Sequence, residues 1–342
     1  MSNGRLNASK QAMRKKMPNW NEILDEINEQ AAKGNALDVV RRNYLSKAHE
    51  ITGRNVIAYY SGFLQNPDVE QTTINDNDKN GLMTVINKLD RSKGLDLIIH
   101  TPGGDLAAVE SIVDYLKLMF GDDIIAIIPQ IAMSAGTMVA CACKSIIMGK
   151  QSNLGPIDPQ FRGIPAMGVI EEFTRAMIEI SEDPSKIPIW QVIIAKYHPT
   201  FIGECEKAIE WSQKMVTKWL SENMLKNRKN PSEEAERIVS FLSNSGSTTS
   251  HSKHIGLLEC EDTGLNIIRL EDYLKDKDYQ DCILSVHHSF MHTFSNSSSV
   301  KIIENHLSVA MVQHFSQPPQ GLQQIYASIP EQSTNDKISI ED

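Results

Sequence analysis

Two short segments of the chain combine a nucleophile with main-chain hydrogen-bond donors. One reads His-Thr-Pro-Gly-Gly-Asp at residues 100–105, and the other reads Ala-Met-Ser-Ala-Gly-Thr at residues 132–137. Paired glycines let the main chain bend sharply and leave N–H groups exposed at the start of a helix, which suits an oxyanion. Ser134 adds a hydroxyl, and the amide of Ala135 follows it. Together the segments predict acyl transfer on a serine. Taken singly, they are also typical of a tight turn and of a helix-capping serine.

The surrounding pattern predicts a layered α/β sheet that brings these segments together. Apolar runs without alternation indicate buried parallel strands at residues 55–61, 95–100, 124–129 and 145–148. Helices are expected at residues 82–89 and 106–120, from the turn at 133–136 to Cys143, and over 170–225. Gly103 and Gly104 precede Ser134 by 31 and 30 residues, about one crossover unit, so the two segments follow neighbouring strands. Ligands bind at such strand ends.

Composition excludes several classes of protein. The chain has 342 residues, with 34 basic and 43 acidic side chains and a net charge of −9, which fits a folded soluble protein and argues against nucleic-acid binding. Five cysteines without a CxxC pair, and no secretory signal, favour a cytoplasmic location. Residues 124–143 carry no charge, yet Pro129, Gln130 and Ser134 interrupt them, so we expect no membrane span.

No cofactor or metal is predicted. The histidines at 287, 288 and 292 include a pair four residues apart, as metal ligands on one helical face would be. No Cys, Asp or Glu nearby completes a ligand set, so packing or an interface explains them more simply.

Residues 95–160 carry a resemblance to a known family. The segments IIHTPGGDLAAVESIVDYL, IIPQIAMSAGTMVACA and IIMGKQSNLGPIDPQFRGIPA resemble the Clp-protease/crotonase superfamily, and within it the signal peptide peptidase-like serine peptidases, closest to the prokaryotic serine dehydrogenase proteinase family. The resemblance implies a spiral of ββα units with helical additions, assembled into trimers or hexamers. It implies peptide-bond hydrolysis through an acyl-enzyme on Ser134. The amides of Gly103 or Gly104 and of Ala135 would form the oxyanion hole.

The general base departs from the family pattern. The Clp-type histidine would fall at residues 155–158 and the signal peptide peptidase-type lysine at 165–168, but neither residue type stands there. His251, 13 residues before Gly264, is the predicted base, with His254 as a second candidate. The alternative interpretation of His251 is a surface histidine in a Ser-rich loop. Asp158, between two prolines, is expected to orient the base or bind the substrate amine, or else to cap a helix.

The domain organisation follows from these assignments. We expect a helical N-terminal arm at 1–50, a catalytic domain at 51–275, a C-terminal extension at 276–315 that is an interface candidate, and a flexible tail at 316–342. The expected substrate is a peptide or unfolded protein. Two other functions remain open: a crotonase-like acyl-CoA enzyme, and a noncatalytic peptide-binding scaffold of the same fold.

Overall fold

The central element of the fold is a mixed seven-stranded sheet. The computed structural model describes residues 19–31, 35–161, 163–248, 253–275 and 277–315. Within these residues the sheet has the order β10-β5-β3-β2-β1-β11-β12. Its first five strands are parallel, whereas β11 and β12 are antiparallel to their neighbours. The strands are β1 (Asn55–Ser61), β2 (Leu95–His100), β3 (Ile124–Ile128), β5 (Ser145–Met148), β10 (Ile267–Arg269), β11 (Ser299–Asn305) and β12 (Ala310–His314). The predicted layered α/β architecture is confirmed.

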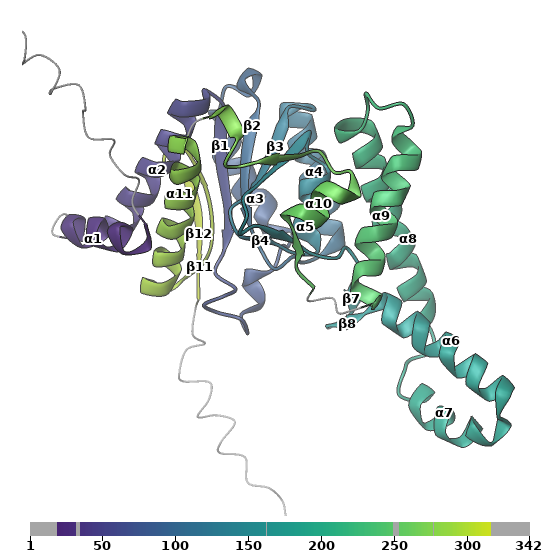
Figure 1. Cartoon of the computed structure of the whole chain (residues 1–342). Coiled ribbons are helices and arrows are strands. Elements are labelled where there is room, and N and C mark those ends of the chain that lie inside the picture. The colour runs from purple at the N-terminus through teal and green to yellow at the C-terminus, as the bar shows by residue number, and fades with distance from the viewer. Residues whose placement is uncertain (1–18, 32–34, 162, 249–252, 276, 316–342) are drawn as a thin grey trace, which may run out of the picture.

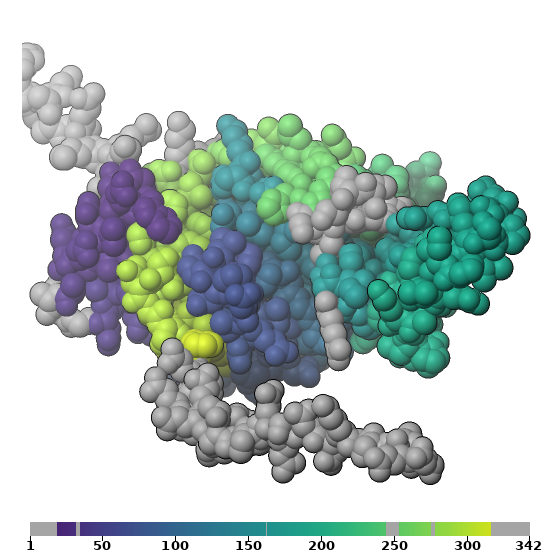
Figure 2. All heavy atoms as spheres, turned by 90° about the horizontal axis from the view of Figure 1, so that it is seen from below, coloured from purple at the N-terminus to yellow at the C-terminus, as the bar shows by residue number. Residues whose placement is uncertain are grey.

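Helices cover both faces of this sheet, which explains why its strands are apolar on both sides. One face packs against α3 (Asn77–Ile86), α4 (Leu106–Phe120), α5 (Ala135–Cys141), α9 (Pro231–Thr248) and α10 (Leu257–Thr263). The other face packs against α1 (Trp20–Gln30), α2 (Ala36–Thr52) and α11 (Lys277–Asn296). Figures 1 and 2 show the N-terminal helices beside the C-terminal part of the described chain. Because β11 pairs with β1, the segment predicted as a C-terminal extension supplies a strand of the main sheet.

Helix α4 shows how local chemistry sets an element next to the site. It starts where Asp105 accepts a hydrogen bond from the Ala108 amide at 2.8 Å, a side-chain cap. It ends at Gly121, whose φ of 62° suits glycine. Its apolar residues recur at helical spacing and are buried against the sheet. The predicted bounds of α4, β1, β2 and β5 are confirmed.

Two smaller sheets and a helical projection complete the fold. Strands β4 (Ile131–Ala132), β6 (Asn153–Leu154) and β9 (Ile255–Gly256) form one small sheet, and β7 (Gln160–Phe161) and β8 (Ile164–Pro165) form a hairpin. Helices α6 (Ala166–Glu182) and α7 (Ile187–Ile194) project from the body (Figure 1). Helix α8 (Phe201–Trp219) then leads back to the sheet through a short π-helical turn, Leu220–Met224.

Candidate active site

Ser134 occupies a strained turn between β4 and α5. Its φ of 49° and ψ of −115° lie outside the conformations that residues with a Cβ ordinarily adopt. The side chain is half-buried, and its hydroxyl does not cap α5. Ser134 thus occupies the N-cap position of α5, as the alternative interpretation expected, but it makes no side-chain capping hydrogen bond there. A serine on a tight strand-to-helix turn presents its hydroxyl outward, as a nucleophile requires.

The glycine loop at residues 103–105 lies directly against this turn. Strands β2 and β3 are neighbours, as the spacing of the two segments predicts. Gly103 has a φ of +104°, and a Cβ added to it would lie 2.8 Å from the Cβ of Ser134 and 2.9 Å from the Met133 carbonyl oxygen. Only glycine fits at this position, because both the backbone conformation and the space exclude a side chain.

Two main-chain amides beside Ser134 remain available as donors. The N–H of Gly103 donates to Thr101 Oγ1 at 3.2 Å, so it is already used. The Ile74 N–H donates to the Gly103 carbonyl, and the Asp105 N–H donates to the Ile74 carbonyl. In this parallel pairing the N–H of Gly104, which lies between them, points away from Ile74. Among the described residues, neither the Gly104 nor the Ala135 N–H has a hydrogen-bond acceptor. The sequence left the choice between Gly103 and Gly104 open, and this pattern favours Gly104.

A cleft of about 980 Å³ opens above these groups. It contains Ser134, Ala135 and both glycines, and its walls include the hairpin residue Phe161 and the indole of Trp211 on α8. Trp211 donates from Nε1 to Glu110 at 3.2 Å. The described lining has carboxylates and no lysine or arginine. In full, that lining is Glu70, Gln71, Thr73, Ile74, Asn75, Pro102, Gly103, Gly104, Asp105, Leu106, Ala107, Ser134, Ala135, Met138, Pro159, Gln160, Phe161, Gly163, Ala208 and Trp211.

Sequence reasoning missed the wall residues of this cleft. Residues 73–75 belong to a polar loop, and Trp211 belongs to a helix in which tryptophan is typical of ordinary packing. An unusually exposed aromatic is visible only in the structure, where Trp211 is 40% exposed.

Asp158 contacts the start of α6. It is buried, and its Oδ1 accepts the Met167 N–H at 3.2 Å near the start of that helix. Its Oδ2 has no hydrogen-bond partner among the described residues. Burial raises the pKa of this carboxyl to about 6. The residue is absent from the cleft lining, although its neighbour Pro159 is present. Its described contact is that of a helix cap.

The predicted base His251 lies outside the described residues. Strand β6 is parallel to β4 and antiparallel to β9. Lys253 and His254, just before β9, therefore lie at the same end of the small sheet as Ser134, which follows β4. His254, two residues from Gly256 in this approach, is exposed.

The histidines at 287, 288 and 292 pack within α11 and its neighbours. His287 Nδ1 lies 3.4 Å from the Tyr60 hydroxyl, and the His292 ring lies 4.0 Å from the Trp20 ring, tilted by 36°. Burial lowers the pKa of His287 well below its usual value. The described residues contain no group of three or more His, Cys, Asp or Glu side chains arranged to hold a metal. None of the described helices is long and apolar enough to cross a membrane.

A serine on a strained strand-to-helix turn, beside a glycine loop at the end of a parallel sheet, is the arrangement of α/β proteins that use a nucleophilic serine. Residues 27–268 match the model of the SDH_protease family, described as ClpP-like SDH-type serine proteinase. The chain belongs to this family, as the resemblance in residues 95–160 indicated.

Two relatives from Methanocaldococcus jannaschii are similar over a shorter part of the chain. Uncharacterized protein MJ1495 is 36% identical over 121 residues, 35% of this chain and 40% of that protein. Uncharacterized protein MJ0137 is 35% identical over 115 residues, 34% of this chain and 39% of that protein. The match thus spans about two fifths of the length of either relative.

Proposed function

We propose that this chain is a serine endopeptidase of the Clp-like, signal peptide peptidase-like kind that hydrolyses peptide bonds through an acyl-enzyme on Ser134. The observation that carries the proposal is the meeting, in one open cleft, of a strained serine with two main-chain amides that lack acceptors among the described residues. Membership of a serine proteinase family supports it.

The proposed reaction has two steps. Ser134 Oγ attacks the carbonyl carbon while a base removes its proton, and the oxygen of the tetrahedral adduct accepts hydrogen bonds from the Gly104 and Ala135 amides. The base returns the proton to the departing amine. A water then attacks the ester in the same way, which releases the acid and restores the serine. Two such donors stabilise the adduct by several kcal/mol, since losing one costs about 100- to 1000-fold in rate.

His251 is the proposed base, with His254 as the alternative and Asp158 as the group that orients it. The strand directions around β9 support a base from this segment, because the described residues Lys253 and His254, just before Ile255, lie at the end of β4 that Ser134 follows. A neutral imidazole near its usual pKa of about 6.5 accepts a proton efficiently at neutral pH.

The cleft lining favours a peptide over an acyl-CoA. Its described residues include Glu70 and Asp105 but no cation to hold the phosphates of coenzyme A. Its walls carry Phe161 and Trp211, which give apolar contact area for side chains of a peptide or unfolded protein.

The proposal extends to assembly and location. We also propose a spiral of ββα units, a catalytic domain at 51–275, a homo-oligomer of three or six chains and a cytoplasmic location. Exposed apolar side chains on the projection support an oligomer, because helices that are apolar on several sides are ordinarily covered. These side chains are Met177, Ile178, Ile187, Ile189 and Val192.

Labelling with a fluorophosphonate tests the proposal directly. We expect the probe to add to Ser134, and Ser134→Ala to abolish both labelling and peptide hydrolysis. Ser185→Ala, which changes an exposed serine between α6 and α7, is the matched control and should keep both. Undiminished hydrolysis by Ser134→Ala would refute the proposal. Saturable binding of an acyl-CoA without labelling would support the crotonase-like alternative instead.

A further inference from the structure

Residues 73–75, called the wall segment below, hold the glycine loop from the side opposite Ser134. The Ile74 N–H donates to the Gly103 carbonyl at 2.8 Å, and the Asp105 N–H donates to the Ile74 carbonyl at 2.9 Å. A Cβ on Gly104 would lie 2.3 Å from both the nitrogen and the oxygen of Ile74. No side chain fits between the two backbones, and two hydrogen bonds join them, so a shift of Ile74 would move Gly104.

A buried ion pair holds the other side of the wall segment. Lys301 on β11 and Asp78 on α3 are both 0% exposed, and Lys301 Nζ lies 2.8 and 2.9 Å from the two Asp78 oxygens. The same ammonium donates to the Thr73 carbonyl at 2.6 Å. Asp78 Oδ2 accepts the Asn75 N–H at 3.0 Å. The pair therefore binds the main chain on both sides of Ile74.

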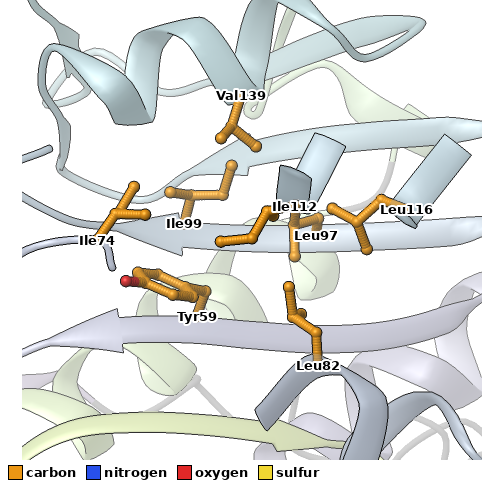
Figure 3. A pocket seen from close by; sticks show the side chains of 8 residues that line it. All are labelled: Tyr59, Ile74, Leu82, Leu97, Ile99, Ile112, Leu116 and Val139. Atoms are coloured by element: carbon orange, nitrogen blue, oxygen red, sulfur yellow. The ribbon is translucent and has the colours of Figure 1, made fainter. Parts of the chain in front are cut away.

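Tyr59 on β1 is a further hydrogen-bond partner of this ion pair. Its hydroxyl donates to Asp78 Oδ2 at 2.7 Å. Figure 3 shows the Tyr59 ring beside Ile74, with its hydroxyl toward that residue. The Asp78 carboxylate is therefore held from β1 as well as from β11.

We propose that the Lys301–Asp78 ion pair is a positioning device for the oxyanion hole. It fixes the wall segment, and the wall segment aims the Gly104 N–H at the cleft. This inference rests on the proposed function for its catalytic meaning. Lys301 and Asp78 are positioning residues, because neither is among the residues that line the cleft.

A need for fold stability alone does not explain such a pair. Removing two charges from water costs about as much as their attraction returns, so a buried pair adds little net stability. The role we assign is geometric, and displacements of about 1 Å at a reacting centre cost about 100-fold in rate.

The same strand offers a matched control. Glu304 lies three residues after Lys301 and therefore on the opposite face of β11. There it pairs with Arg41 of α2, and both side chains are 0% exposed. This second pair is as buried as the first but faces away from the cleft.

The experiment compares two charge-neutral double variants of the full chain. Lys301→Met with Asp78→Asn removes the positioning pair without leaving a buried charge unpaired, and Arg41→Met with Glu304→Gln does the same to the control pair. For each we would measure the melting temperature, the rate of Ser134 labelling by a fluorophosphonate, kcat and KM for a peptide, and amide hydrogen exchange of residues 72–75 and 103–105.

We expect the positioning variant to label Ser134 about 10- to 100-fold more slowly, with kcat falling and KM little changed. Its Ile74 and Asp105 amides should exchange at least about tenfold faster. The control variant should match the wild type within about threefold in labelling and exchange, even if it melts earlier. Equal effects of the two variants, or unchanged labelling after the positioning pair is lost, would overturn the inference.

Hydrogen exchange keeps this test separate from the proposed function. If wild-type Ser134 does not label at all, the proposed function fails. Faster exchange confined to the positioning variant would still support the mechanical link from Lys301 to the loop, and unchanged exchange would overturn that link.

Discussion

Substitution of Gly103 by alanine tests the contact on which the site depends. The new Cβ would meet the Ser134 Cβ at 2.8 Å, the Met133 carbonyl oxygen at 2.9 Å and the Ala135 nitrogen at 3.1 Å. All three belong to the turn that carries the nucleophile, and two of them are backbone atoms, which cannot swing aside. Relief therefore requires the loop and the turn to separate.

The cost has two parts. A residue with a Cβ held at a φ near +104° is strained by about 1 to 3 kcal/mol. Forcing a methyl group into filled space adds about 1 to 3 kcal/mol. The expected loss of unfolding free energy is the sum, about 2 to 6 kcal/mol.

Gly53→Ala separates these two parts. Gly53 ends α2 with a φ of +68° and has no atom within 4 Å of an added Cβ. This control should therefore lose only about 1 to 2 kcal/mol, from backbone strain. Urea denaturation followed by tryptophan fluorescence measures both losses.

The rate at which a fluorophosphonate labels Ser134 provides a second measurement. With the loop displaced, fluorophosphonate labelling of Gly103→Ala should slow by about 100-fold or more, whereas Gly53→Ala should label as the wild type does. If Gly103→Ala proved as stable as Gly53→Ala and labelled at the wild-type rate, the close approach of the two turns would be refuted.

Two further predictions concern pH. Burial raises the pKa of Asp158 to about 6 in the folded state, so its ionisation destabilises the fold as pH rises from about 4 to 6. Asp158→Asn should therefore raise the unfolding free energy by up to about 3 kcal/mol at pH 8 but by under about 1 kcal/mol at pH 4. Equal gains at both pH values would contradict burial of the charge as the cause. Burial lowers the pKa of His100 to about 4 in the folded state, so this histidine is protonated more readily in the unfolded chain. The unfolding free energy should therefore fall by up to about 3 kcal/mol as pH falls from 6.5 to 4. Urea titrations of His100→Asn and wild type between pH 7 and 4.5 check this, because the variant should show the smaller loss.

The parallel core was predictable because its signals are local. Strands β1, β2 and β5 coincide with apolar runs, and α4 coincides with an apolar period bounded by Asp105 and Gly121. Helix α3 begins at Asn77, five residues before the predicted start, because its first turn is polar. In this turn the polar residue Asp78 is buried and pairs with Lys301, which is 223 positions away in sequence.

The sequence did not predict strands β11 and β12. β11 carries Lys301 and Glu304, and buried strands rarely contain charged residues. Each of these charges is neutralised by a partner on a distant helix, Asp78 or Arg41. No local pattern reveals such pairing, so the sequence predicted only a C-terminal extension at 276–315.

The order of residues by itself determined the nucleophile candidate, the glycine loop and their adjacency, since one crossover unit separates two strand ends. Only the tertiary structure decided that the Gly104 N–H, unlike that of Gly103, lacks an acceptor among the described residues, and that Ile74, Lys301 and Asp78 hold this loop. The physical reason is that a donor is free or occupied according to the groups that fold against it. Thr101 occupies the Gly103 N–H from two residues away, but Ile74 comes from 30 positions before Gly104, and Lys301 reaches Thr73 from 228 positions away.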